Sequence, residues 1–203
     1  MSDVKSLKDL KVVAFAGYAG AGKGTAGLAL AHRDWKCFSF ATPLREIVSR
    51  VYHVPMHFFT DPILKNEIHP NLNGKSPRKV LQLIGTEGFR HLIDEDTWVK
   101  CLERDVLAFL RQFPPGYPPG FYIDDLRFLS EIKFLQSRDV ITVYVENPNV
   151  SQQFSHQSED EIGQVGDKCD YRIINDGTIS DLLQKVGDVM DSSHVQTYFK
   201  NRS

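Results

Sequence analysis

A glycine-rich stretch directly after a short apolar run constrains this chain more than any other feature of its sequence. Residues 11–16 form a short run that is apolar after Lys11 and predicts a buried strand, and residues 25–32 are mostly small and compatible with a helix. Between them the chain reads Gly17-Tyr18-Ala19-Gly20-Ala21-Gly22-Lys23-Gly24-Thr25. Glycines at such a junction let the backbone curl so that successive N–H groups face an anion. The helix N-terminus and the lysine add positive charge, so the stretch predicts a phosphate-binding loop.

The hydroxyl of this loop is displaced by one position from the usual pattern. Gly24 follows the lysine, and Thr25 comes next. Thr25 is therefore the candidate ligand for Mg²⁺, either directly or through water. The alternative is a glycine-rich turn with an incidental lysine. Such a turn would not require a preceding strand, this glycine spacing, a lysine and a hydroxyl to occur together. The loop alone indicates a bound nucleoside triphosphate and does not separate switches, ATPases and kinases.

Composition excludes several classes of protein. The 203 residues carry 24 Lys and Arg against 26 Asp and Glu, a net charge of −2, which argues against a nucleic acid polymer or a membrane as partner. No apolar run approaches the roughly 18 residues that span a bilayer. The three cysteines lie far apart, as expected of a reduced cytoplasmic protein without a disulfide framework or a zinc site.

Short apolar runs alternate with helical patterns along the chain. This alternation predicts an α/β fold of three layers, with a parallel five-stranded sheet and helices on both faces. Its ligand site is expected at the carboxyl ends of the strands. Strands are predicted at 11–16, 35–40, 121–123, 140–145 and 171–174, and helices at 25–32, 42–52, 78–92, 98–113, 130–136 and 179–190.

We expect one domain over residues 1–203. Its core covers about 10–40 and 120–193, and a helical insertion covers about 42–113. The proline-rich residues 113–120 predict a surface loop. The polar segment of about 147–168 is either a flap or a solvated loop.

The predicted helix 78–92 carries polar residues at every fourth position. Arg78, Gln82, Thr86 and Arg90 share a face that drifts slowly around the helix, while the opposite face is apolar. Phosphoryl transfer between two anions needs positive charge beyond the loop lysine. These residues either grip a phosphate and a base or form a solvated surface.

Here the sequence resembles a known family. Residues 76–90, followed by Asp96-Thr97-Trp98-Val99, resemble the deoxynucleoside monophosphate kinases, which are well represented in bacteriophages. Residues 40–46, 123–131, 156–159 and 174–178 also resemble motifs of that family, in the same order. The resemblance implies a phosphate-loop kinase fold with a helical acceptor-binding insertion and a short flap.

The resemblance also implies roles for individual residues. The acceptor monophosphate would be held by Arg45, Arg78 and Arg90, with Gln82, Trp98, Glu131, His156 and Ser158 as further substrate contacts. For Trp98 a place in the core is the alternative. The donor ATP would be held by the phosphate loop, with Asn175 and Gly177 beside the adenine.

Two acidic residues follow the predicted strand 121–123. The family pattern favours Asp125 over Asp124 as the Mg²⁺-organising carboxylate, and Arg127 would face the same way. Asp125 either orients magnesium-bound water or accepts a hydrogen bond from the substrate phosphate. Lys23, Arg45, Asp125 and Arg127 are therefore the predicted catalytic residues.

One position departs from the family pattern. An arginine–proline pair often follows the fourth strand, whereas this chain has Glu146-Asn147-Pro148. Arg127, Lys133 and Arg138 are the candidates to replace the missing arginine.

The function expected from these observations is transfer of the γ-phosphoryl group of Mg·ATP to a deoxynucleoside monophosphate. The first rival is a kinase of another small acceptor, such as dephospho-coenzyme A or a sugar acid. The second is a non-catalytic nucleotide switch. The partners are small nucleotides, a homodimer is compatible with the sequence, and the expected location is the cytoplasm, that of the host cell if the protein is phage-encoded.

Overall fold

Five parallel strands form one sheet in this computed structural model, which describes residues 6–113, 119–150, 157–200 and 202. The strand order is β2-β3-β1-β4-β5, and every neighbouring pair is parallel. The strands are β1 (Val12–Ala16), β2 (Lys36–Phe38), β3 (Phe121–Leu126), β4 (Ile141–Glu146) and β5 (Tyr171–Ile174). The predicted α/β class with a five-stranded parallel sheet is confirmed.

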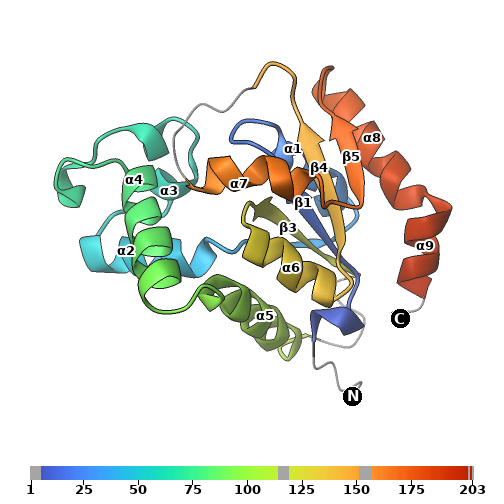
Figure 1. Ribbon diagram of the computed structural model, residues 1–203, viewed down its shortest axis with the longest axis horizontal. Helices are drawn as coiled ribbons and strands as arrows, with labels where there is room; N and C mark the ends of the chain where they lie inside the picture. Colours follow the sequence, from blue (N-terminus) through green and yellow to red (C-terminus); the bar gives the residue numbers. More distant parts are fainter. Residues whose placement is uncertain (1–5, 114–118, 151–156, 201, 203) are drawn as a thin grey trace. The chain divides into compact units, whose positions relative to one another are not determined.

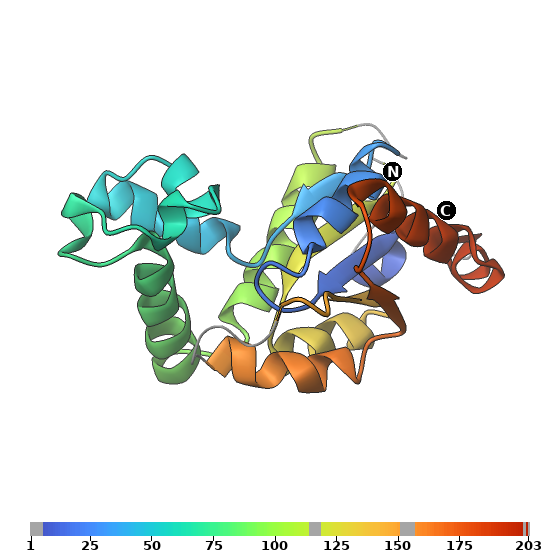
Figure 2. The ribbon, with the colours of Figure 1, turned by 90° about the horizontal axis from the view of Figure 1, so that it is seen from above.

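Helices cover both faces of this sheet. The connections β1 to β2 and β3 to β4 cross the sheet in opposite directions, so right-handed crossovers put their helices on opposite faces. Figures 1 and 2 show this layering, and the contacts agree, since α1 packs against α8 and α6 against α7. These helices are α1 (Lys23–Ala31), α6 (Leu129–Ser137), α7 (Gln157–Gly166) and α8 (Ile179–Asp191).

The central strand explains why the sheet is buried. All five residues of β1 are buried, as expected of a strand covered on both faces. The core on the α1 and α8 side also includes the final helix α9 (Ser193–Lys200), whose Phe199 ring lies 5.5 Å from the Trp35 ring. Its buried members are Val13, Phe15, Ala26, Leu30, Tyr122, Ile141, Val143, Val145, Ile173, Leu182, Val186, Met190, Val195 and Phe199.

The chain divides into two compact units. One comprises residues 1–39 and 102–203, and the other residues 40–101. The second unit contains α2 (Thr42–Tyr52), α3 (His57–Thr60), η2 (Leu64–Asn66), η3 (Pro70–Leu72), α4 (Pro77–Gln82) and η4 (Leu83–Arg90). The boundary falls within α5 (Thr97–Leu110). Within the second unit, Leu44, Val48, Val54, Phe59, Leu72 and Val80 are buried.

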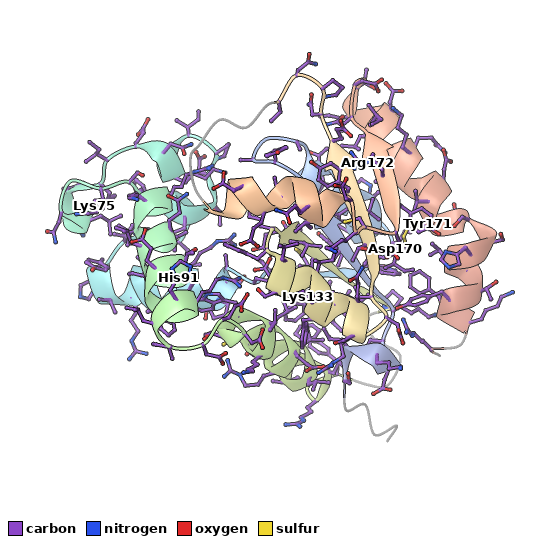
Figure 3. All side chains as sticks on the ribbon, in the orientation of Figure 1. Lys75, His91, Lys133, Asp170, Tyr171 and Arg172 are labelled. Atoms are coloured by element: carbon purple, nitrogen blue, oxygen red, sulfur yellow. The ribbon has the colours of Figure 1, made fainter. Side chains whose placement is uncertain are left out.

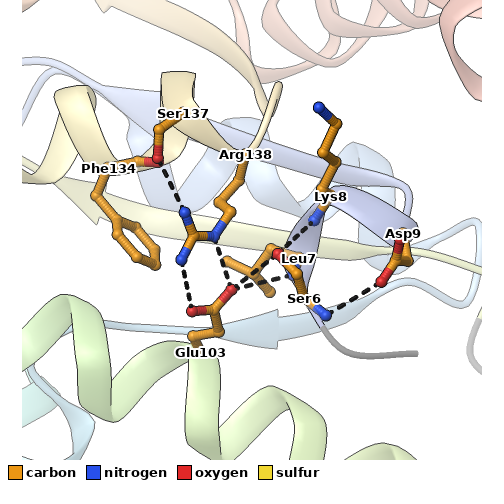
Figure 4. Close-up of polar contacts among 8 residues, drawn as sticks. All are labelled: Ser6, Leu7, Lys8, Asp9, Glu103, Phe134, Ser137 and Arg138. Carbon is orange, nitrogen blue, oxygen red and sulfur yellow. Dashed lines mark hydrogen bonds and ion pairs between the residues drawn. The ribbon is translucent and has the colours of Figure 1, made fainter. Parts of the chain in front are cut away.

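The N-terminal turn η1 (Leu7–Asp9) is tied to the first unit by a polar network (Figure 4). Glu103 accepts hydrogen bonds from the Ser6 hydroxyl and the Leu7 N–H, at 3.1 and 3.3 Å. It also forms two hydrogen bonds with the Arg138 guanidinium, at 2.9 and 3.1 Å. Arg138 directly follows α6 and precedes β4, so this network lies at the amino edge of the parallel sheet.

Several local predictions differ from the structure. The pair Thr42-Pro43 would be typical of an N-cap followed by a first-turn proline, but Thr42 is the first residue of α2 and Ala41 is its N-cap. The polar segment 147–168 contains the helix α7, which buries Ile162 and Val165. Residues 114–118 of the predicted proline-rich loop and residues 151–156 of the predicted flap lie outside the described residues. Over the described ranges, no helix has the length and apolar character needed to cross a bilayer.

Candidate active site

The predicted phosphate loop connects β1 to α1. Gly17 follows the last residue of β1, and its backbone φ is +144°. A Cβ at this position would lie 2.3 Å from the carbonyl oxygen of Val145 on β4, so the loop leaves the sheet where only glycine fits. Gly22 ends the loop in the left-handed conformation, with φ +104°, and α1 begins at Lys23. The glycines thus provide the backbone conformation that the sequence predicted.

Lys23 folds back over this loop. Its Nζ donates to the carbonyl oxygens of Gly17 and Tyr18, at 2.6 and 2.8 Å, and the residue is 7% exposed. The N–H of Ala21 also donates to the Tyr18 carbonyl, at 3.1 Å. The ammonium charge is therefore held inside the curl of the loop. Ala19 and Thr25 are half-buried, whereas Gly20 and Gly24 are exposed.

Asp125 lies in a bulge of β3. The pairing of β3 with β1 shifts between Ala14 and Ala16, so that Ala14 is level with Ile123 and Ala16 with Leu126. The strand thus continues through Asp125, whereas the sequence predicted an end before it. Bulges of this kind redirect side chains and are common beside functional sites. Asp125 consequently lies level with the end of β1, where the phosphate loop begins.

Ser39 is a site residue that the sequence analysis missed. Its hydroxyl donates to Asp125 Oδ2 at 2.5 Å, and the residue is buried. Ser39 directly follows β2, and β2 pairs with β3 so that Phe38 is level with Ile123. A serine at the carboxyl end of a strand was the available signal. Its contact fixes the orientation of the Asp125 carboxylate.

Glu131 binds backbone N–H groups in the connection from β3 to α6. It is 2% exposed, and its Oε2 accepts hydrogen bonds from the N–H groups of Arg127 and Phe128, at 2.8 and 3.1 Å. This carboxylate caps the N-terminus of α6 and fixes the backbone at Arg127. The substrate contact expected of Glu131 stays a prediction beside these backbone contacts.

Asn175 contacts the phosphate loop itself. Its side-chain Nδ2 donates to the Ala21 carbonyl at 2.9 Å, and its backbone N–H donates to the Glu146 carbonyl at 2.6 Å. Gly177 is exposed and precedes Thr178, which caps α8. In the same connection, a hydrogen bond from Lys185 lowers the pKa of Asp176.

Glu146, which stands where the family pattern has arginine, has its own basic partner. The guanidinium of Arg172 on β5 donates to Glu146 Oε2 at 2.6 Å and lies 4.7 Å from the Tyr144 ring centroid. Figure 3 labels Arg172 on β5 and Lys133 on α6. Lys133 is exposed. Arg138 is engaged at the amino edge of the sheet, whereas the phosphate loop leaves the carboxyl edge, so Arg138 does not replace the missing arginine.

The second unit carries the arginine motif on a helix of mixed type. Residues 77–82 are α-helical and residues 83–90 form a π-helix. A spacing of four residues is slightly more than one turn of an α-helix and slightly less than one turn of the wider π-helix. Every fourth side chain therefore drifts around the axis in one direction in the α-helical part and in the opposite direction in the π-helical part. Arg78, Gln82, Thr86 and Arg90 thereby stay close to one face.

The polar face of this helix is not a solvated surface. Thr86 and Arg90 are buried, while Arg78 and Gln82 are half-buried. Arg90 donates to the carbonyl oxygen of Glu95 at 3.3 Å. The alternative of a solubilising surface is therefore wrong for Thr86 and Arg90.

Helix α2 joins the same small core. A Cβ on Gly85 would lie 2.5 Å from Leu44 Cδ2, so α2 and η4 approach closely at this point, next to Arg45. Trp98 is 4% exposed, and its Nε1 donates to the Gly85 carbonyl at 3.0 Å. Its ring lies 5.0 Å from the Phe89 ring. The contacts of Trp98 are those of a core residue.

Two predicted substrate contacts fall where the structure gives no side-chain description. His156 lies outside the described residues. Ser158 belongs to α7, but its side chain is likewise outside the description.

The fold and the loop define a class: a parallel α/β protein with a phosphate-binding loop after its central strand. A family model described as deoxynucleotide monophosphate kinase matches residues 56–186, and the chain belongs to this family. It is therefore a phosphotransferase. The matched range includes Arg78, Arg90, Asp125 and Asn175, and it begins after the phosphate loop and Arg45.

Solved structures of similar architecture come from other kinases. Shikimate kinase from Aquifex aeolicus is 13% identical, with 91% of this chain and 98% of that chain covered and a TM-score of 0.49. Dephospho-CoA kinase from Campylobacter jejuni is 15% identical, with 89% and 95% covered and a TM-score of 0.49. Comparison with curated protein sequences gives no significant match. The family assignment rests on the family model alone.

Proposed function

We propose that this enzyme transfers the γ-phosphoryl group of ATP to a deoxynucleoside monophosphate and so produces a deoxynucleoside diphosphate and ADP. The observation that carries the proposal is the family match over residues 56–186, which includes the whole arginine helix from Arg78 to Arg90. The cytoplasm, that of the host cell for a phage protein, is the proposed location, since its reducing conditions suit three cysteines that lie far apart in the sequence.

The donor triphosphate binds at the phosphate loop in this proposal. Backbone N–H groups of the loop and the N-terminus of α1 attract the phosphates. Lys23 exchanges its contacts with the Gly17 and Tyr18 carbonyls for phosphate oxygens, because an anion is a stronger partner for an ammonium than a neutral carbonyl.

The residues at the carboxyl edge also suit a magnesium ion. Asp125 and Thr25 offer oxygen atoms, which Mg²⁺ prefers, and Mg²⁺ usually takes one or two protein oxygens plus phosphates and water. Among the described residues, no group of three or more His, Cys, Asp or Glu could hold a metal ion. Bound there, the ion would neutralise charge on the donor phosphates.

The acceptor monophosphate binds to Arg45, Arg78 and Arg90, with Gln82 at its base. We assign the unit of residues 40–101 to this role, in place of the predicted insertion 42–113. Arginine suits the role because its planar guanidinium forms two charge-assisted hydrogen bonds with a phosphate. His156 and Ser158 are retained as proposed substrate contacts.

The chemistry needs no covalent enzyme intermediate. An oxygen of the acceptor phosphate forms a bond to the γ-phosphorus, and the bond from that phosphorus to the β-phosphate oxygen breaks to release ADP. The acceptor oxygen is already anionic, so the reaction gains its rate from alignment and from neutralised repulsion between the substrates. Asp125, held by Ser39, and Arg127, held by Glu131, are the positioned groups at the donor side.

Initial rates of substituted enzymes test the division into two sites. Arg78→Ala is expected to lower kcat/KM for the deoxynucleotide by ~2–4 kcal/mol of transition-state stabilisation while leaving the affinity for ATP unchanged. Lys79→Ala is the matched control, because Lys79 is its exposed neighbour on the same helix. Equal losses of ATP affinity and acceptor use would refute the assignment of Arg78 to the acceptor.

A panel of acceptors tests the substrate class. Turnover is expected with at least one deoxynucleoside monophosphate and absent with dephospho-coenzyme A and with sugar acids. Turnover of one of these rivals alone would overturn the proposal.

A further inference from the structure

We propose that Asn175 is a positioning residue of the phosphate loop, which orients the peptide between Ala21 and Gly22 so that the Gly22 N–H faces the bound phosphate. This inference rests on the proposed function only in so far as the loop binds a polyphosphate. It differs from the role expected from the family resemblance, in which Asn175 lies beside the adenine.

Asn175 is itself held firmly in the connection from β5 to α8. Its backbone N–H donates to the carbonyl of Glu146 at 2.6 Å. The preceding carbonyl, that of Ile174, accepts a hydrogen bond from Lys185 Nζ at 2.7 Å. Three residues later, Thr178 and Asp181 cap α8 reciprocally. The side-chain amide of Asn175 thus projects from a backbone that is fixed on both sides.

The contact with the loop determines the direction of one peptide group. Asn175 Nδ2 donates to the Ala21 carbonyl at 2.9 Å. In a trans peptide the C=O and the following N–H are coplanar and point in opposite directions. Because the Ala21 carbonyl is turned toward Asn175, the Gly22 N–H is turned away from it.

The carbonyls of Gly17 and Tyr18 are turned to Lys23 in the same way. The carbonyls of Gly17, Tyr18 and Ala21 thus have donors within the protein, so the N–H groups that follow them, those of Tyr18, Ala19 and Gly22, point in the opposite direction. This orientation of successive amides is what an anion-binding loop requires.

The glycine at position 22 is explained by the same contact. A Cβ there would lie 2.6 Å from Asn175 Nδ2 and 3.3 Å from Leu182 Cδ2. The backbone φ of +104° also disfavours any other residue. The amide of Asn175 therefore occupies the space that a side chain at Gly22 would need, and the two residues form a complementary pair 153 positions apart in the sequence.

Two probes separate this role from contact with adenine. Inorganic tripolyphosphate offers phosphates without a base, and adenosine offers the base without phosphates. If Asn175 positions the loop, Asn175→Ala weakens the binding of ATP and of tripolyphosphate by the same factor, about tenfold for one lost hydrogen bond near an anion. Adenosine binding then stays within about twofold of the wild type.

Asn175→Asp is the near-isosteric variant. Its carboxylate cannot donate to the Ala21 carbonyl, so we expect a loss at least as large as that of Asn175→Ala. Asn149→Asp is the matched control, because it adds the same charge at an exposed position after β4, whereas the hydrogen bond to the Ala21 carbonyl comes from Asn175. It is expected to bind tripolyphosphate like the wild type. A loss as large as that of Asn175→Asp would show a mere charge effect and overturn the inference.

The amide resonance of Gly22 gives a readout that general loss of stability does not move. In ¹⁵N-labelled wild type, tripolyphosphate is expected to shift the Gly22 N–H resonance downfield, and in folded Asn175→Ala the shift is lost. An unchanged shift, or loss of ATP binding without loss of tripolyphosphate binding, overturns the inference. If the shift behaves as expected but no deoxynucleotide is phosphorylated, the proposed function fails and the inference stands.

Discussion

Removal of the Glu131 carboxylate is expected to destabilise the first unit strongly. One oxygen of this side chain, which is 2% exposed, accepts both the Arg127 and the Phe128 N–H groups. Each buried amide left without a partner costs ~1–3 kcal/mol, so Glu131→Ala is expected to lower the free energy of unfolding by ~2–6 kcal/mol. Glu131→Gln keeps an oxygen that can accept both bonds and loses only the charge, so its loss should be about half as large.

Urea denaturation followed by circular dichroism measures this loss, and the thermal midpoint should fall by about 2–4 °C for each kcal/mol. Glu161→Ala provides a scale, because Glu161 accepts one N–H, that of Leu129, at 2.8 Å. It should cost about half as much as Glu131→Ala. The reasoning is refuted if Glu131→Ala is no more harmful than Glu161→Ala. A normal stability with a raised KM for the deoxynucleotide would instead restore the substrate contact expected from the sequence.

Three further substitutions or conditions test other parts of the structure. Gly17→Ala should weaken ATP binding by at least about tenfold in calorimetry, because the new Cβ would overlap the Val145 carbonyl; unchanged binding would contradict this. Burial raises the pKa of the Cys169 thiol from 9.0 to about 12, so the unfolded chain loses this proton first. Stability should therefore fall as the pH rises from about 9 to 12, less steeply in Cys169→Ala, and equal slopes would contradict the assignment. Trp98→Phe should cost ~1–2 kcal/mol in urea denaturation through the lost hydrogen bond to the Gly85 carbonyl, with an unchanged KM for the deoxynucleotide. A raised KM would indicate that Trp98 contacts the substrate.

The strands were predictable because each is a short apolar run. The last strand, residues 171–174, has the predicted bounds. The strand predicted at 121–123 continues to Leu126, since a bulge accommodates Asp124 and Asp125. Acidic residues are rare in buried strands, so Asp124 and Asp125 indicated that the strand ends before them. In the structure β3 continues past them because it stays paired with β1.

Helices α7 and α9 escaped prediction because they are short and mostly polar. Helix α9 buries only Val195 and Phe199, and α7 buries Ile162 and Val165 among many polar residues. So few apolar positions give no clear helical period. The π-helix at residues 83–90 was not predictable either, because side-chain spacing does not reveal which backbone carbonyl each N–H bonds.

The phosphate loop was predictable because its residues are contiguous and their chemistry is local. The groups that hold the site in place are not local. Ser39 reaches Asp125 across 86 positions, and Asn175 reaches Ala21 across 154. Such contacts depend on strand order and register, which a single sequence does not specify. For the same reason the contacts of Glu131 and Asn175 with backbone groups of the protein were not predictable, and their contacts with ligands stay predictions.

Transfer of isotope from [γ-³²P]ATP tests the central claim most directly. The purified enzyme is incubated with labelled ATP and each deoxynucleoside monophosphate in turn, and the products are separated by chromatography, with Lys23→Ala as the blank. We expect the label in a deoxynucleoside diphosphate for the wild type and in ATP alone for the variant. Label that appears only as inorganic phosphate, or a variant as active as the wild type, would contradict the account.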